Sequence, residues 1–136
     1  MGKIYQWFTA LYQSLTKLLY YRNLGQCAEH LAAIYLKRQG LSLLKHNFYS
    51  PQGEIDLIMV HNHTLVFIEV RLRIDNSAKE SVTLAKQRRI IKTAHQFLAK
   101  HPAYRIWPMR FDVIAMTACS IDAIEWLPDA FEANIS

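Results

Sequence analysis

The segment from Gly53 to Arg73, GEIDLIMVHNHTLVFIEVRLR, constrains the fold more than any other part of the chain. Its two apolar runs predict two strands joined by the polar turn HNH. Acidic residues interrupt both runs, namely Glu54 and Asp56 in the first and Glu69 in the second. Because side chains alternate along a strand, Glu54 and Asp56 point to the same face of the predicted sheet.

These carboxylates need a positively charged partner. A carboxylate among apolar neighbours loses hydration, at a cost of roughly several kcal/mol if it stays unpaired. Arg71 and Arg73 follow Glu69 on the same face of its strand. The partner is therefore a metal ion, an arginine, or each of them in turn.

The rest of the chain predicts an α/β fold, with a mixed central sheet of about five strands flanked by helices. The expected order is a helix, three strands, a crossover helix and two strands. The expected ranges are a helix over 25–39 that stops at Gly40, a strand over 41–49, the two strands of 53–73, a helix from Ser81 or Thr83 to about Lys100, strands over 109–117 and 121–127, and a loose acidic tail from Pro128.

Two polar side chains lie on otherwise apolar stretches of these helices. Glu29 has Ala32, Ala33 and Leu36 as helical neighbours, so its carboxylate is either aimed at the packed side or simply exposed. In the later helix, Gln87 belongs to the predicted core stripe. That stripe consists of Leu84, Gln87, Ile91, Ala94 and Leu98.

Residues 1–22 predict an additional amphipathic helix at the N-terminus. Ile4, Phe8, Leu11, Leu15 and Leu18 follow helical spacing, while polar residues interrupt the run too often for a membrane span. The segment has three basic residues and no acidic residue. It could dock on a membrane surface, on a protein partner, on its own domain or on a second copy of the chain.

The charge distribution points towards a phosphate-bearing partner. Residues 1–110 contain all 16 Lys and Arg against 6 acids, whereas residues 111–136 contain 5 acids and neither Lys nor Arg. Such a basic surface suits nucleic acid, although a solvated surface would look the same. Cys27 and Cys119 form no CxxC pair, which predicts a reducing compartment, the cytoplasm, and no disulfide framework.

Several other polar and aromatic residues have structural explanations. His61 and His63 are expected to be solvated in the turn between the two strands. Asp112 shares a face with Arg110, which predicts a structural ion pair. The two tryptophans near the C-terminal strands, Trp107 and Trp126, are expected to pack in the core or at its edge, with stacking on an unpaired base as the alternative.

Five segments together resemble a family of small bacterial proteins. They are GQCAEHLAAIYLKRQG, GEIDLIMV, LVFIEVRLR, TLAKQRRI and MRFDVIAM, which occur in this order between about residues 24 and 132. The chain resembles the YraN-like group, UPF0102, which is itself similar to archaeal Holliday junction resolvases and the PD-(D/E)XK nuclease superfamily. This resemblance implies a restriction endonuclease-like core over residues 23–132, preceded by the extension 1–22 and followed by a loose tail over 133–136.

The resemblance also implies roles for individual residues. It places the metal-binding acids of the nuclease motif at Glu29, Asp56 and Glu69, the motif lysine at Arg71, and a polar helical residue at Gln87. In such enzymes the carboxylates hold Mg²⁺ or Mn²⁺, which activates water for phosphodiester hydrolysis. We expect Glu29, Asp56, Glu69 and Arg71 to meet in one cleft.

A nucleic-acid-binding surface is expected beside that cleft. Its predicted members are Arg73, Lys86, Arg88, Arg89 and Lys92. The resemblance further implies DNA as the nucleic acid and a homodimer as the assembly.

Arg71 departs from the nuclease pattern, because an arginine stays protonated and cannot act as a general base. It can grip a phosphate, or it can pair with Asp56 or Glu69 and fill the place of a metal. Three functions therefore stay open. They are a metal-dependent endonuclease acting on branched or distorted DNA, a non-catalytic nucleic-acid-binding module, and a membrane-peripheral adaptor that uses residues 1–22.

Overall fold

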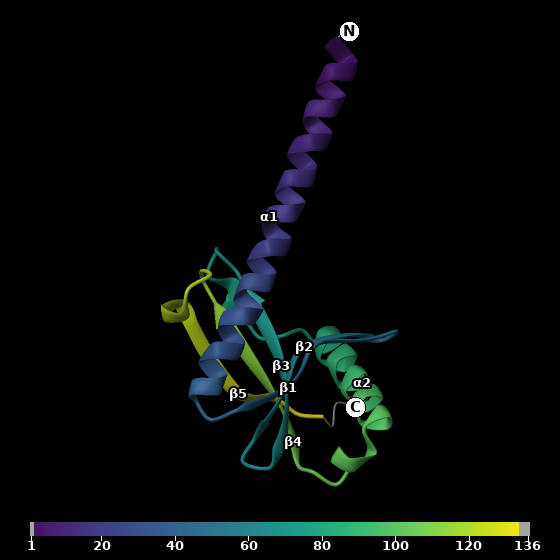
Figure 1. Cartoon of the computed structure of the whole chain (residues 1–136), viewed down its shortest axis with the longest axis vertical. Helices are drawn as coiled ribbons and strands as arrows, with labels where there is room; N and C mark the ends of the chain where they lie inside the picture. Colours follow the sequence, from purple (N-terminus) through teal and green to yellow (C-terminus); the bar gives the residue numbers. More distant parts are fainter. Residues whose placement is uncertain (1, 134–136) are drawn as a thin grey trace.

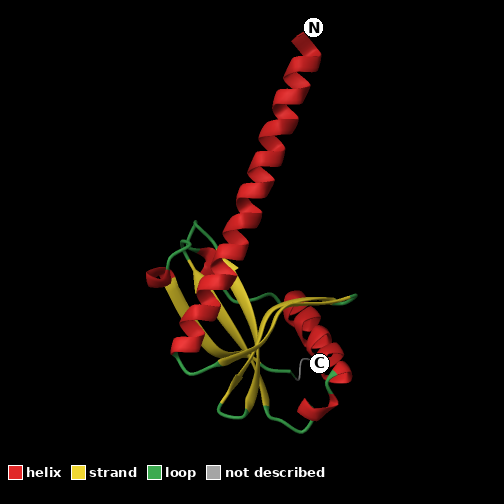
Figure 2. Ribbon diagram, in the orientation of Figure 1, coloured by secondary structure: helices red, strands yellow, loops and turns green. Residues whose placement is uncertain are grey.

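The computed structural model describes residues 2–133, apart from the side chain of Lys79. One five-stranded sheet lies between two helices (Figure 2). The elements are α1 (Gly2–Arg38), β1 (Ser42–Ser50), β2 (Gly53–His61), β3 (Thr64–Leu72), α2 (Leu84–Lys100), β4 (Met109–Met116) and β5 (Ile124–Phe131), with 3-10 turns at Ser77–Lys79, Pro102–Tyr104 and Ile121–Ala123.

The strands lie in sequence order in the sheet, β1-β2-β3-β4-β5. Only β3 and β4 run parallel, because α2 carries the chain back across the sheet between them, while the other neighbours are antiparallel. The predicted α/β fold with a mixed sheet is confirmed. The hairpin turn between β2 and β3 is also where it was expected, since Asn62 and His63 both have positive φ angles of 49° and 62°.

The two helices cover opposite faces of the sheet. Ile90, Ala94 and Phe97 of α2 pack with one set of alternating strand residues, which includes Phe67 and Phe111. Ala28, Ala32, Ala33 and Leu36 of α1 pack on the other face, against Leu57, Met59, Val66, Ile68, Ile114 and Met116. The alternation of these strand residues follows from the two-residue period of a strand.

The predicted break between two N-terminal helices is wrong, because α1 is one helix of 37 residues. Gly25 does not interrupt it, and a Cβ at this position would meet nothing within 4 Å. Only the last third of α1 packs on the sheet, and the rest projects away from it (Figure 1). The helix ends as predicted at Gly40, whose φ of +96° favours glycine, and the Leu41 amide closes the end by bonding the Leu36 carbonyl oxygen at 3.0 Å.

The sheet forks at Asp56. β2 pairs with β3 from His61↔Thr64 as far as Leu57↔Ile68, and then no further. Beyond this point β2 stays paired with β1, and β3 stays paired with β4 as far as Leu72↔Met116. We call this separation of β2 from β3 the sheet fork.

The tip of the β1–β2 hairpin rests against α2, and this close approach requires a glycine at position 53. A Cβ on Gly53 would lie 3.3 Å from the Thr93 hydroxyl oxygen and 3.7 Å from the Arg89 Cβ, and its φ of +152° is strained for other residues. Thr93 also bonds the Arg89 carbonyl oxygen at 2.7 Å. The hairpin tip thus lies against α2 on the side where β2 has separated from β3.

The helix start at Thr83 is confirmed, since its hydroxyl accepts a hydrogen bond from the Lys86 amide at 3.2 Å. The predicted core stripe of α2 is confirmed at Ala94, and Ile91 and Leu98 pack partly buried against the core, but the centre of the buried side lies about one position earlier. Leu84 is 57% exposed, and the buried residues are Ile90, Thr93, Ala94 and Phe97. Thr93 is polar and therefore did not indicate a core position in the sequence. It can be buried because its hydroxyl donates a hydrogen bond within the helix.

The predicted loose tail from Pro128 is also wrong. β5 begins later than expected and continues through Pro128 to Phe131, which is buried and stacks on Phe111 with 5.0 Å between ring centroids. Ala133 packs against the same core. The remainder of the expected tail, residues 134–136, lies outside the described residues.

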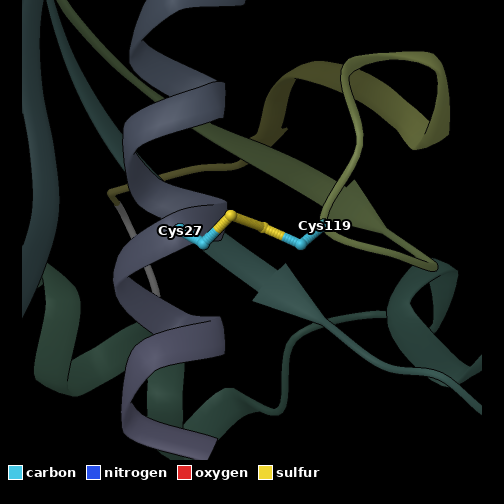
Figure 3. The surroundings of a disulfide bond; sticks show 2 residues. All are labelled: Cys27 and Cys119. Atoms are coloured by element: carbon cyan, nitrogen blue, oxygen red, sulfur yellow. A yellow bond between two sulfur atoms is a disulfide. The ribbon is translucent and has the colours of Figure 1, made fainter. Parts of the chain in front are cut away.

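Cys27 and Cys119 form a disulfide, contrary to the sequence prediction. The bond joins α1 to the loop after β4, with a Cα–Cα distance of 6.3 Å (Figure 3). The two residues are 92 positions apart, and nothing in their local sequence indicates that the fold brings them together. The bond ties the packed part of α1 to the opposite half of the chain.

Candidate metal and nucleic-acid site

Three carboxylates from two elements meet at the sheet fork. Glu29 comes from α1, and Glu54 and Asp56 come from β2. One oxygen atom of each lies within 4.8 Å of the others. Carboxylate oxygens are the ligands that Mg²⁺ and Mn²⁺ prefer, so this group of atoms fits a small divalent cation.

Asn47 of β1 connects two of these carboxylates. With its amide nitrogen turned towards them, it donates to Glu29 Oε2 at 3.0 Å and to Glu54 Oε1 at 3.1 Å. Asn47 has a positive φ of 48°, which asparagine tolerates better than most residues. The β1–β2 hairpin thus contributes a neutral donor to the acidic group.

Asp56 lies where the ladder between β2 and β3 stops, and its side chain replaces the missing strand contact. Its Oδ2 accepts a hydrogen bond from the Val70 amide at 2.7 Å. Burial and the negative charges of Glu69, Glu29 and Glu54 together raise the pKa of Asp56 from 3.8 to about 8, although the Val70 hydrogen bond lowers it. The site therefore favours either a proton or a cation at Asp56.

The same forces act more weakly on Glu29. Partial burial raises the pKa of this carboxyl, with repulsion from Glu54 and Glu69 in the same direction, while the hydrogen bonds with Asn47 and Asp56 oppose the rise. The helix thus holds Glu29 half-buried against the packed side, one of the two arrangements that the sequence left open.

Glu69 of β3 borders the group from the α2 side of the sheet. Its Oε1 lies 3.4 Å from Lys86 Nζ, and its side chain is 13% exposed against 39% for Lys86. Its charge acts on both Asp56 and Glu29. Glu69 and Glu29 thus approach Asp56 from the sides of α2 and α1, which lie on opposite faces of the sheet. The expectation that Glu29, Asp56, Glu69 and Arg71 meet in one cleft is therefore wrong for Glu69 and Arg71, because the carboxylates that meet are Glu29, Glu54 and Asp56.

Arg71 does not take a metal's place. Its Nη1 donates to the carbonyl oxygen of Glu80, and within residues 2–133 the structure records no ion pair between Arg71 and a carboxylate. Gln87 lies away from the acidic group, because its amide donates to the Val82 carbonyl oxygen at 2.7 Å and it lines a separate pocket with Val113 and Phe131.

Of the other predicted basic residues, Arg89 and Arg73 lie close to elements of the sheet fork. Arg88, Arg89 and Lys92 are exposed on α2, whose residue Arg89 touches the hairpin tip. Arg73 follows β3 and lines a pocket of about 500 Å³ together with Glu29. The remaining lining residues are Tyr21, Leu24, Gly25, Ala28, Val70, Leu72, Ile74 and Asp75. The pocket therefore adjoins the acidic group.

Asp112 forms the predicted ion pair with Arg110, with 3.0 Å between Arg110 Nε and Asp112 Oδ1. Trp126 Nε1 also donates to this carboxylate at 2.9 Å. His61 is not merely solvated, since its Nδ1 lies 2.9 Å from Arg110 Nη2. His63 stacks on Trp107 with a centroid distance of 3.8 Å, so both tryptophans have the structural contacts that the sequence favoured.

Sequence reasoning did not assign Glu54 and Asn47 to the site. A signal for Glu54 was present, because it lies two positions before Asp56 and shares its face. No comparable signal marks Asn47, which reaches the group only through the pairing of β1 with β2, where Tyr49 lies opposite Glu54.

The fold and this acidic group define an α/β protein with a carboxylate site at a fork in a mixed sheet. The chain belongs to the uncharacterised protein family UPF0102, whose model matches residues 28–116. A UPF0102 protein of Alcanivorax borkumensis is 47% identical over 115 residues, which cover 81% of this chain and 92% of the relative. A relative from Nitrosomonas europaea is 42% identical over 115 residues, covering 82% and 96% of the two chains.

Proposed function

We propose that this protein is a divalent-metal-dependent endonuclease that binds branched or otherwise distorted DNA. The observation that carries the proposal is the meeting of Glu29, Glu54 and Asp56 within 4.8 Å, together with the raised pKa of Asp56. A carboxyl group with three acidic neighbours is most readily stabilised by a cation. The resemblance to PD-(D/E)XK nucleases supports phosphodiester hydrolysis as the chemistry of such a site.

Glu29, Glu54 and Asp56 would hold Mg²⁺ or Mn²⁺ in this proposal. When bound, the cation supplies positive charge for phosphate oxygens and makes water more acidic. The Val70 amide fixes Asp56 by its bond to Oδ2, and Asn47 orients Glu29 and Glu54. These bonds leave the carboxylates pointing together at the sheet fork.

The nuclease pattern has a lysine at the position of Arg71, and we propose that Lys86 supplies this ammonium group instead. Its Nζ lies 3.4 Å from Glu69 Oε1, whereas Arg71 bonds the Glu80 backbone. A lysine ammonium can donate or release a proton, which an arginine guanidinium cannot. We therefore assign to Lys86 the proton-holding role beside Glu69, and to Arg71 a contact with the DNA backbone.

The basic residues around the sheet fork would hold the DNA. Arg88, Arg89 and Lys92 line the exposed side of α2, and phosphate contacts from such side chains set affinity without reading sequence. Arg73 and the pocket beside Glu29 offer room for a displaced strand. The proposal places the protein with DNA in the cytoplasm, a compartment for which the Cys27–Cys119 disulfide is atypical.

One observation favours a second candidate, a DNA-binding module without catalysis. Lys86 already neutralises part of the acidic charge by pairing with Glu69. If that pair replaces a cation, the protein would bind DNA through α2 and leave it intact.

A cleavage assay separates the two candidates. A four-way junction, a flap and a plain duplex are incubated with the full chain and Mg²⁺ or Mn²⁺, alongside Asp56→Asn and Glu69→Ala. The endonuclease proposal predicts metal-dependent cutting of the branched substrates and a loss of roughly a hundredfold or more in both variants. Asp122→Asn, at an exposed acid outside the site, is the matched control. Binding of all three DNAs without cutting would support the module instead.

A further inference from the structure

Most of the exposed large apolar side chains among the described residues lie on the part of α1 from Gly2 to Asn23. Every residue from Gly2 to Asn23 is exposed, although the segment is rich in large apolar side chains. We define the N-terminal apolar face by the residues that share one side of this helix. They are Ile4, Trp7, Phe8, Leu11, Tyr12, Leu15, Leu18 and Leu19, with exposed fractions between 41% and 70%.

The opposite side of the same helix is mainly polar, with Tyr20 as an aromatic exception. Lys3, Gln6, Gln13 and Lys17 follow one another at spacings of three, seven and four, which place them on one side. Thr9 and Thr16 complete this side, and their hydroxyls bond the helix's own carbonyl oxygens of Tyr5 and Gln13. The segment is thus amphipathic, and its polar groups need no protein partner.

The charge of the segment has a single sign. Lys3, Lys17 and Arg22 are basic, and residues 2–23 contain no acid. No helix in the described part of the chain is long and apolar enough to cross a membrane. A cationic helix with aromatic and aliphatic residues on one side matches the composition of helices that lie in the plane of a membrane surface.

The protein's own domain does not cover this face, because the segment projects away from the sheet along its whole length (Figure 1). A second copy of α1 fits it poorly for two reasons. A helix pair would bring together segments that carry only positive charge. In addition, the uneven side chains of Trp7, Phe8 and Tyr12 do not suit the regular aliphatic seam of a coiled coil.

We propose that the N-terminal apolar face docks the protein on an anionic lipid surface, with α1 lying in the interface. Trp7 and Tyr12 have the amphipathic rings that settle at headgroup depth, while Leu11 and Leu15 reach the acyl chains. Lys3, Lys17 and Arg22 meet the negative headgroups. This attachment is independent of the acidic group at the sheet fork and does not depend on nuclease activity.

Vesicle flotation with the full chain tests the proposal. Vesicles of phosphatidylcholine alone are compared with vesicles of phosphatidylcholine and phosphatidylglycerol in equal parts. Because each Lys or Arg near an anionic surface contributes about fivefold, three of them predict on the order of 100-fold stronger binding to the mixed vesicles. Equal binding to both vesicles, or binding to neither, would overturn the proposal.

A matched pair of variants distinguishes the helix from the basic surface of the domain. Leu11→Gln with Leu15→Gln removes apolar side chains and leaves the charge unchanged, whereas Thr9→Gln with Thr16→Gln places the same side chains on the polar side. The first pair should weaken vesicle binding by at least about tenfold and the second by less than about twofold. All four positions are exposed, so neither pair disturbs the fold.

Two results from these variants would contradict the lipid surface as the partner. Undiminished vesicle binding by the Leu11 and Leu15 variant would mean that the basic domain alone attracts the vesicles. A dimer of the wild type that dissociates in this variant, without vesicle binding by either protein, would assign the N-terminal apolar face to a second copy of the chain. Sedimentation equilibrium measures that dimer.

Discussion

Asp56 and Asp112 both lie on strands of the sheet, yet the surroundings of their two carboxylates are opposite in charge. Asp112 is fully buried and accepts bonds from Arg110 Nε and Nη2, from Trp126 Nε1 and from the Asp129 amide, at 2.9–3.2 Å. Asp56 accepts one bond from a backbone amide and has three other carboxylates around it. Donors of its own chain thus satisfy Asp112 fully, whereas Asp56 is the carboxylate for which we propose a cation.

The contrast sets a carboxylate with a structural environment, Asp112, beside one that we propose to be functional, Asp56. The Asp112 region joins β4 to β5 through charged and polar donors, so its removal should harm the fold. The Asp56 region concentrates negative charge, so its removal should relieve repulsion and harm only function.

The largest expected effect comes from Asp112→Ala. This substitution leaves the guanidinium of Arg110 and the donors of Trp126 and Asp129 without their acceptor. Breaking a buried ion pair by removing one partner costs about 3–5 kcal/mol, and we expect a loss of this size in the free energy of unfolding. Urea denaturation measures it, and a loss below about 1 kcal/mol would show that Asp112 is not structural.

At Asp56, in contrast, we expect the charged carboxylate to lower the free energy of unfolding. Its pKa is raised from 3.8 to about 8 in the folded protein, so the unfolded chain loses this proton at lower pH than the folded chain. The free energy of unfolding should therefore fall as pH rises from about 4 to about 8, by roughly 2–4 kcal/mol. Thermal melts across this range should show the fall in the wild type, and Mg²⁺ should offset it at pH 8.

Asp56→Asn is the control for this pH dependence. An asparagine can still accept the Val70 hydrogen bond but carries no charge, so the variant should be more stable than the wild type at pH 8 and less dependent on pH. A variant that is less stable than the wild type at both pH 5 and pH 8 would place Asp56 with Asp112 as a structural residue.

A smaller effect is expected from Arg71→Ala, which tests whether Asp56 lacks a cationic partner. Arg71 bonds the Glu80 carbonyl oxygen, so its loss should cost about 1–2 kcal/mol, with no dependence on added metal. Thermal melts with and without Mg²⁺ measure both quantities. Destabilisation that Mg²⁺ rescues would instead mean that Arg71 neutralises the acidic group in solution.

The smallest effect concerns the face of the molecule that meets DNA. Replacing Arg88 and Arg89 by Ala should reduce the slope of log affinity against log salt by about 0.9 for each phosphate that the variant no longer neutralises. Lys37→Ala with Arg38→Ala, at exposed basic residues at the end of α1, is the matched control and should leave the slope unchanged. Equal slopes for both pairs would remove α2 from the DNA interface.

The sequence predicted the fold where local patterns agree with the final packing. The strands β1 to β3, the turn at Asn62 and His63, and the start of α2 at Thr83 all follow from periodicity and turn chemistry. The predictions were wrong where contacts between distant parts of the chain determine the local structure. The stacking of Phe131 on Phe111 extends β5, and the fold brings Cys119 to Cys27.

The site was predictable in part for the same reason. Acidic residues in apolar strands indicated Asp56 and Glu69 directly, and the helical neighbours of Glu29 suggested one face. The sheet fork was not visible in the sequence, because the apolar patterns of β2 and β3 continue past Leu57↔Ile68, where their pairing ends. The pairing of Lys86 with Glu69 likewise needs the position of α2 across the sheet.

Calorimetric titration of Mg²⁺ and Mn²⁺ into the full chain tests whether Asp56 belongs to a cation site. Measurements at pH 7 in two buffers of different ionisation enthalpy also count the protons that binding releases. The account predicts binding with the release of up to about one proton, because Asp56 with its pKa of about 8 holds a proton that a cation displaces. It also predicts that Asp56→Asn loses both the binding and the release. Absence of binding to the wild type, or equal binding to Asp56→Asn, would contradict it.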